Sequence, residues 1–373
     1  MTERPDDDDS LKVRLVALTR DLVIIPSTVT RPEDRERCYQ SVHNHLDAIP
    51  GIAIREYRCE GHPSLVALPE GCDAPEVLMC AHLDVVGLPD GAMYQSHIAD
   101  GRIYGPGTGD MKGQLAISLE LFRAFHHRHP GVPLGLAVTS DEEIGGVHGT
   151  GYLFGPVGLR CGVAIIPDGG SLDQVTVEEK GILHLRLSAF GHAGHAARPW
   201  LTANVVDALT DAAARLRHRF AQFVDHEPDH WYPTCTITAL RTDSDTINRI
   251  PSEAEALVDI RFPPPHTLSS IYQLVRETIG PQVQANVLVG AEPTHLAPDP
   301  VYLDLAQAAT GRSVRRGRES GGSDARFVCA HGIPVIMARP DVGNLHSEDE
   351  WIDIDSMLTF YDICQRYLEQ RLI

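Results

Sequence analysis

The chain has 373 residues, of which 43% are hydrophobic, and its formal net charge is −19 at pH 7. That length exceeds what one hydrophobic core usually supports, so we expect two domains. The strong negative charge argues against nucleic acids and anionic membranes as partners. No apolar run reaches the roughly 20 residues of a membrane span. The eight scattered cysteines form no C-x-x-C pair, which favours reduced thiols in a cytoplasmic protein.

The first part of the chain alternates apolar strands with an amphipathic helix. Residues 1–10 carry an acidic run, Asp6 to Asp9, without an apolar segment, so we expect a disordered tail rather than a signal peptide. Ser10 can cap a first helix that ends near Val23. Apolar spacing predicts a helix over 113–129, and short apolar runs predict buried strands at 76–81, 134–139 and 162–166. This order is typical of a mixed-sheet α/β domain.

The pattern changes near Glu179. The following elements read as strand, helix, strand, strand, helix and strand, at 182–190, 202–224, 234–240, 254–262, 267–279 and 283–289. This is the βαββαβ, ferredoxin-like order of a small α+β domain. The α/β pattern resumes near Ala297. We therefore expect a catalytic domain formed by 11–178 and 292–373, with an inserted domain at 179–291.

Metal-binding and proton-transfer residue types follow the expected strands of the catalytic domain. His82 and Asp84 follow the first, Glu142 and Glu143 the second, and Asp168 the third. In open α/β sheets, ligands bind where the strands end. Taken singly, each residue has an ordinary alternative. His82 and Asp84 could be a surface His–Asp pair, and Glu142 and Glu143 could belong to an acidic loop without function. In other loops, Asp110 could cap a helix and His346 could be an unremarkable histidine. Their joint occurrence favours a two-metal site.

Adjacent carboxylates at a buried strand end, such as Glu142 and Glu143, repel each other unless cations neutralise them. One carboxylate can bind a metal while its neighbour acts as a base on metal-bound water. Because zinc lowers the pKa of bound water to about 7, this division of roles suits amide hydrolysis. Asp84 can accept a hydrogen bond from His82 and fix its tautomer.

At these residues the chain resembles the zinc metallopeptidase family of aminoacylase, carboxypeptidase G and S, acetylornithine deacetylase and succinyl-diaminopimelate desuccinylase. The strongest motifs are Ala81-His82-Leu83-Asp84-Val85-Val86, Gly105 to Gly113 and Ser140 to Gly145. Supporting motifs are Gly191 to Pro199, Asn248-Arg249-Ile250-Pro251, Asp259-Ile260-Arg261 and Gly321 to Ala325.

The resemblance implies a role for each matching residue. His82 and Asp168 would bind one zinc ion, Glu143 and His346 the other, and Asp110 both. Glu142 would be the general base and Asp84 the residue that orients His82. His195 would be the histidine of the inserted lid domain that reaches the partner subunit's site in a homodimer and polarises the substrate carbonyl. Substrate-binding positions would be Asn248, Arg261, Gly321, Gly322 and Ser323.

Two departures from the family pattern argue against a biosynthetic deacylase. Asp168 stands where the deacylases usually carry Glu, and Arg339 adds a cation near the last metal ligand, where it could bind an acidic substrate or pair with Asp341 or Glu350.

The expected function is hydrolysis of a peptide or N-acyl-amino-acid amide bond beside a free carboxylate. The reaction would use metal-bound hydroxide and two Zn²⁺ per subunit, with Co²⁺ or Mn²⁺ also suitable. The alternatives are an acetylornithine- or succinyl-diaminopimelate-type deacylase, a two-metal phosphoesterase and an inactive metal-binding protein.

Overall fold

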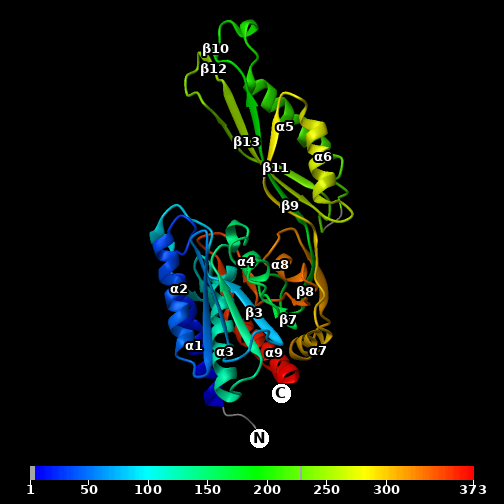
Figure 1. Ribbon diagram of the computed structural model, residues 1–373. Helices are drawn as coiled ribbons and strands as arrows, with labels where there is room; N and C mark the ends of the chain where they lie inside the picture. Colours follow the sequence, from blue (N-terminus) through cyan, green and yellow to red (C-terminus); the bar gives the residue numbers. More distant parts are fainter. Residues whose placement is uncertain (1–4, 227–228) are drawn as a thin grey trace. The chain divides into compact units, whose positions relative to one another are not determined.

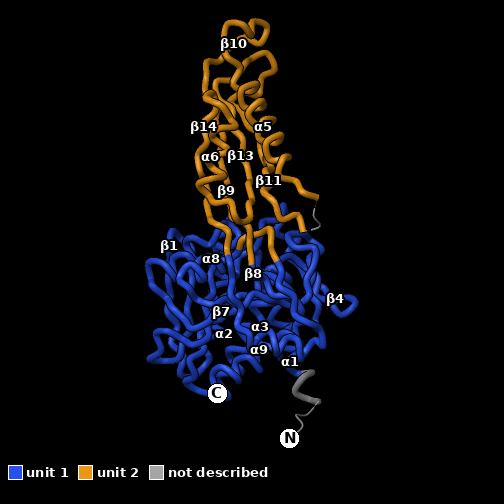
Figure 2. The backbone as a smooth tube through the Cα atoms, turned by 90° about the vertical axis from the view of Figure 1, so that its right-hand side faces the viewer, with its two compact units in different colours: residues 1–177, 295–317, 323–373 blue, residues 178–294, 318–322 orange. Residues whose placement is uncertain are grey.

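The computed structural model describes residues 5–226 and 229–373, which form two compact units (Figure 2). Unit 1 comprises Met1–Val177, His295–Gly317 and Ser323–Ile373, and unit 2 comprises Glu178–Thr294 and Arg318–Gly322. The expected catalytic domain includes residue 178, residues 292–294 and the short segment 318–322, all of which belong to unit 2. Within unit 2, Arg318 forms ion pairs with Glu178 and Asp229, which explains why this short segment belongs there. None of the described helices is both long enough and apolar enough to cross a bilayer.

The first helix begins earlier than the sequence indicated. Helix α1 spans Pro5–Val23, so the second half of the expected disordered tail is helical and Ser10 is not its cap. Proline suits the first helical position, since its fixed φ matches the helix and its missing N–H would have no partner there. Residues 1–4 of the expected tail lie outside the described residues.

A six-stranded sheet in the order β1-β2-β6-β3-β7-β17 forms the centre of unit 1 (Figure 1). Its strands are β1 (Ile52–Cys59), β2 (His62–Pro69), β3 (Val77–His82), β6 (Leu134–Thr139), β7 (Val163–Ile165) and β17 (Val335–Ile336). The neighbouring strands β6, β3, β7 and β17 pair in parallel. Strand β2 pairs antiparallel with both of its neighbours, β1 and β6. The carboxyl ends of four strands therefore lie along one edge.

Alternating side chains of this sheet fill two separate cores, as the two-residue period of a strand requires. Met79 of β3 packs in a core with Phe122 and Phe360, whereas its neighbour Cys80 packs in a core with Phe154 and Val328. The first core is covered by α1, α2 (Pro32–Asp47), α3 (Gly113–Arg128), α7 (Pro300–Thr310) and α9 (Ile354–Leu372). The second is covered by α4 (Thr150–Phe154) and α8 (Ala325–Cys329). Because both faces are buried, the central strands are apolar throughout.

A smaller antiparallel sheet of unit 1, in the order β18-β19-β5-β4, borders the loops that carry two of the expected ligands. Its strands are β4 (His97–Ala99), β5 (Arg102–Tyr104), β18 (Val342–Gly343) and β19 (Trp351–Asp353). Asp110 follows β5 and His346 lies between β18 and β19, so pairing of β5 with β19 brings the two loops to one place.

Unit 2 has the expected βαββαβ order. Its elements are β9 (Gly181–Phe190), α5 (Val205–Ala221), β11 (Thr234–Thr242), β13 (Glu253–Phe262), α6 (Leu268–Ile279) and β14 (Gln284–Ala291). The strands form an antiparallel sheet in the order β11-β13-β9-β14, and its buried residues pack against α5 and α6. A short pair, β10 (Gly194–His195) with β12 (Arg249–Ile250), joins two loops of this unit.

Candidate metal centre

The carboxyl edge of the parallel strands carries the residues that the sequence singled out. His82 ends β3, Glu142 and Glu143 follow β6, and Asp168 follows β7. Two groups of possible metal ligands form here, and within each group the ligand atoms lie within 4.8 Å of one another. The first consists of His82, Glu142 and Asp168, and the second of Asp110, Glu143 and His346.

Asp110 lies between the two groups. Its Oδ1 is 3.2 Å from Nε2 of His82, and its Oδ2 is 3.0 Å from Nε2 of His346. Each carboxylate oxygen therefore faces a histidine of a different group. This is the arrangement that a carboxylate bridging two metal ions needs, and the sequence motif alone did not provide it.

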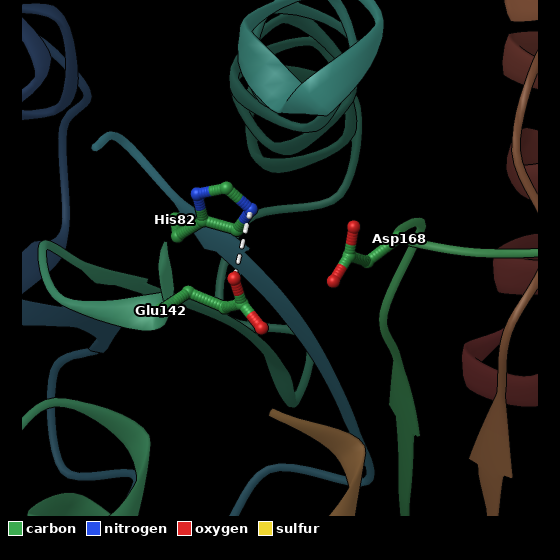
Figure 3. A group of neighbouring side chains, drawn as sticks. All are labelled: His82, Glu142 and Asp168. Carbon is green, nitrogen blue, oxygen red and sulfur yellow. Dashed lines mark ion pairs between the residues drawn. The ribbon is translucent and has the colours of Figure 1, made fainter. Parts of the chain in front are cut away.

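Figure 3 shows the first group, in which the side chains of His82, Glu142 and Asp168 point toward a common space. Nε2 of His82 is 4.0 Å from Oε2 of Glu142. In the second group, Nε2 of His346 is 3.6 Å from Oε2 of Glu143. Glu142 thus lies slightly farther from its histidine than Glu143 does, so its distance suits either a ligand or a nearby base.

The donor atoms fit divalent cations. Nε2 of His82 and Oδ1 of Asp110 are buried, and among the described residues neither has a hydrogen-bond partner. Their separation of 3.2 Å matches the distance of about 3.3 Å between two ligands on a tetrahedral zinc with bonds of about 2.0–2.1 Å. Neutral imidazoles with carboxylates also suit zinc, cobalt and manganese.

The buried negative charge of the two ligand groups also favours the binding of cations. Burial, followed by the charge of Asp168, raises the pKa of Glu142 well above its usual range. Burial, followed by the charge of Asp110, raises the pKa of Glu143 to about 8. The hydrogen bond to Asp110 raises the pKa of His346 to about 9. Without metal, the cluster retains protons to relieve its negative charge, and metal ions would take their place.

Asp84 contacts the backbone of the acidic pair as well as His82. Nδ1 of His82 lies 3.0 Å from the main-chain oxygen of Asp84 and 3.6 Å from its Oδ1. The Asp84 carboxylate accepts the backbone N–H groups of Glu142, at 3.3 Å, and Glu143, at 3.1 Å. Asp84 therefore holds the backbone of both glutamates through its carboxylate. The imidazole of His82 is hydrogen-bonded to the main-chain oxygen of Asp84, whereas we expected the carboxylate to be its partner.

Glu350 belongs to the site, although sequence reasoning considered it only as an ion-pair partner of Arg339. It is 2% exposed, and its carboxylate accepts backbone N–H groups from both ligand-bearing loops. The one sequence signal that could have indicated this role of Glu350 was the glycine-rich loop at 105–109. Its backbone N–H groups need hydrogen-bond acceptors when they are buried.

Arg339 lies beside the first group. Its Nη1 donates to the main-chain oxygen of Asp168 at 3.4 Å, and the described residues contain no ion pair between Arg339 and either Asp341 or Glu350. Arg339 also lines a pocket of about 340 Å³ together with Arg102. A cation is therefore available close to the metal ligands.

His195 is in unit 2, where strand pairing ties its loop to that of Asn248. His195 pairs with Arg249, and the N–H of Ala196 donates to the main-chain oxygen of Asn248 at 2.9 Å. Nδ1 of His195 accepts the N–H of Ala197 at 3.1 Å, which leaves the proton of a neutral ring on Nε2. The exposed His195 side chain therefore presents a hydrogen-bond donor.

Arg261, also in unit 2, already has a carboxylate partner. Its Nε and Nη2 donate to the two oxygens of Asp259 at 2.7 and 3.1 Å. Burial opposes ionisation of Asp259, but hydrogen bonds from His184 and Arg261 outweigh it and hold the pKa of Asp259 below its usual range. A substrate carboxylate at Arg261 would have to share the guanidinium with Asp259.

The predicted substrate-binding turn spans the boundary of the two units, because Gly321 and Gly322 belong to unit 2 and Ser323 to unit 1. Ser323 is 4% exposed, and its Oγ accepts the N–H of Ala325 at 3.2 Å. Ser323 thus supports the start of α8 by this contact.

Residues 78–370 match the model of peptidase family M20/M25/M40. The chain belongs to this family. M20 enzymes are metal-dependent hydrolases that act on amide bonds, and the two ligand groups lie within the matched residues. The fold class, a mixed α/β architecture, and the family resemblance are thereby confirmed.

Similar proteins include both deacylases and peptidases. The chain is 30% identical to the succinyl-diaminopimelate desuccinylase of Bordetella pertussis over 381 residues, which cover 95% of this chain and 97% of that protein. It is 28% identical to that of Rhodospirillum centenum, with 95% and 96% covered. Human carnosine dipeptidase 1 has the same fold, with a TM-score of 0.77, 15% identity, and 98% and 97% coverage. An M20 metallo-carboxypeptidase from Sulfolobus solfataricus also has a TM-score of 0.77, with 16% identity and 96% and 99% coverage.

Proposed function

We propose that the protein is a cytoplasmic di-zinc amidohydrolase that cleaves a peptide or N-acyl-amino-acid amide bond beside a free carboxylate. The observation that carries this proposal is the position of Asp110, with one oxygen facing His82 and the other facing His346. Asp168 would complete the first metal site with His82, and Glu143 would complete the second with His346. The eight free cysteines support a reducing compartment.

Two bound zinc ions would supply an acidic water molecule and polarise the scissile carbonyl. Glu142 would accept the proton of the attacking water through its carboxylate and then donate it to the leaving amine. Its carboxylate lies 4.0 Å from Nε2 of His82, close enough to the first ligand group to reach a water molecule held there. Asp84 would hold Glu142 in place through the backbone N–H.

Unit 2 would recognise the substrate and form a homodimer. His195 would donate the Nε2 proton to the substrate carbonyl oxygen in the partner subunit, and Asn248 and Arg261 would bind the substrate carboxylate. Three exposed apolar side chains near these loops support an interface there, namely Trp200, Leu201 and Ile247, at 76%, 71% and 100% exposure. The turn from Gly321 to Ser323 would line the substrate-binding pocket.

A deacylase of the succinyl-diaminopimelate type is the second candidate, favoured by the relatives of about 30% identity. The experiment that tests both is a rate panel with the Zn²⁺-, Co²⁺- or Mn²⁺-loaded protein. The substrates would be dipeptides, N-acyl amino acids including N-succinyl-diaminopimelate and N-acetylornithine, and a phosphate monoester.

We expect amide hydrolysis that is lost when the adjacent carboxylate of the substrate is converted to an amide. Preference for N-succinyl-diaminopimelate over dipeptides would favour the second candidate. Cleavage of the phosphate monoester alone, or no turnover with any metal, would contradict the proposal and favour a phosphoesterase or an inactive metal-binding protein.

A further inference from the structure

The Glu350 carboxylate accepts four backbone hydrogen bonds. Its Oε1 accepts the N–H groups of Gly109, at 2.7 Å, and Asp110, at 2.8 Å. Its Oε2 accepts those of Gly107, at 3.1 Å, and His346, at 3.2 Å. The main-chain oxygen of Glu350 also accepts the N–H of Gly105 at 2.8 Å. One buried side chain thus joins two loops that are far apart in the sequence.

Both loops carry ligands of the second metal group. The first supplies Asp110 and the second supplies His346, and in each case Glu350 binds the N–H of the ligand residue itself. His346 has a φ of +63°, in the left-handed region that non-glycine residues rarely occupy. Such a conformation persists only where neighbouring contacts impose it. The hydrogen bond to Glu350 is one of those contacts.

A carboxylate fits this position better than any other side chain of the same size. It has two oxygens without protons, so it can accept from N–H groups on both sides. An amide in the same place would offer one oxygen and one NH₂ group. The NH₂ group would face two of the four backbone donors and leave them unpaired.

We propose that Glu350 is a positioning residue that holds the Asp110 and His346 loops at metal-binding distance from each other. This rests on the proposed function, because it assumes that Asp110 and His346 bind metal. Glu350 would touch neither metal nor substrate. Its contribution would be to metal affinity, through the preformed geometry of the second group.

The test is metal binding by Glu350→Gln, measured by competition with a chelator for Zn²⁺ and by the visible absorption of bound Co²⁺. Outer-shell partners of metal ligands typically contribute about 10- to 100-fold to affinity, so we expect a loss in that range and an altered Co²⁺ spectrum. Glu350→Asp keeps the charge but is one methylene too short to reach both loops. It should also bind metal more weakly than the native protein, and it replaces the Gln variant if that variant does not fold.

Glu120→Gln is the matched control. Glu120 is also buried in unit 1, at 4% exposure, but its partners are Arg14, His45 and Arg123 of the helical layer. The control should lose stability and keep native metal affinity and the native Co²⁺ spectrum. Native metal affinity in folded Glu350 variants, or an equal loss in the control, would overturn the inference. A native protein that binds no divalent metal would overturn the proposed function, and the inference with it.

Discussion

Replacing Glu142 by glutamine separates a proton-transfer role from a ligand role. Glutamine keeps the shape of the side chain and one acceptor oxygen, but it cannot take up a proton from water. Oε2 of Glu142 lies 4.0 Å from Nε2 of His82, whereas Oδ1 of Asp110 lies 3.2 Å from the same atom. The closer Asp110, together with Asp168, can therefore complete the first metal site with His82 when Glu142 is changed.

We predict that Glu142→Gln keeps both metal ions and loses about 100- to 10,000-fold in kcat, the usual contribution of a general acid–base. At about 1.36 kcal/mol per factor of ten, the loss corresponds to about 2.7–5.4 kcal/mol of barrier. Glu143→Gln serves as the comparison. Oε2 of Glu143 lies 3.6 Å from Nε2 of His346, so this variant should lose metal as well as activity.

The assay combines initial rates on the best substrate with metal content after gel filtration. A Glu142→Gln variant with near-native turnover would refute the role of base. Loss of one metal ion from that variant would instead make Glu142 a ligand of the first group, alongside His82 and Asp168. Either result would require another residue to carry the proton.

Three further variants test features outside this pair. His195→Ala should fold, bind metal and lose about 100- to 1,000-fold in turnover, as expected for one oxyanion donor. Mixing the His195→Ala and Glu142→Gln variants should restore about a quarter of native activity if His195 acts across a dimer. Half of the dimers are then mixed, and each mixed dimer holds one intact site of two. Proven heterodimers without recovery would disprove action across subunits. Arg339→Ala should raise KM for acidic substrates more than for neutral ones, and an equal effect would exclude a role in selectivity. Burial lowers the pKa of His126 to about 4, so the folded state stays neutral while the unfolded chain gains a proton. The resulting stability is complete above about pH 6.5 and is lost as the pH falls toward 4. Urea unfolding of His126→Gln should therefore depend less on pH between 7 and 5, and an unchanged slope would contradict this account.

The sequence could predict the parts of the site that follow from strand order. His82, Glu142 and Asp168 each come after an apolar run, and parallel strands place such ends along one edge. No comparable rule placed Asp110 and His346 beside these residues, because both lie in loops outside the six-stranded sheet. Their loops meet through backbone contacts to Glu350, 240 residues from Asp110 in the sequence, and side-chain patterns do not record backbone contacts.

Other elements were missed because their signals are weak. Helix α2 buries a narrow stripe that includes Cys38, Tyr39, Val42 and Leu46 within an otherwise polar segment. The β1–β2 hairpin turns at Glu60 and Gly61, with φ of 47° and 82°. Asn or Asp is the usual residue before glycine in such a turn, so Glu60 gave no turn signal.

The order of the ligands along the chain has a consequence for synthesis. His82, Glu142 and Asp168 all precede the segment Glu178–Thr294 that makes most of unit 2, whereas His346 follows it. Because a chain emerges from the ribosome with its N-terminal residues first, the first trio exists before unit 2 has been translated. The second trio exists only afterwards. A growing chain thus gains its two candidate metal groups at different times, separated by the synthesis of an entire folding unit.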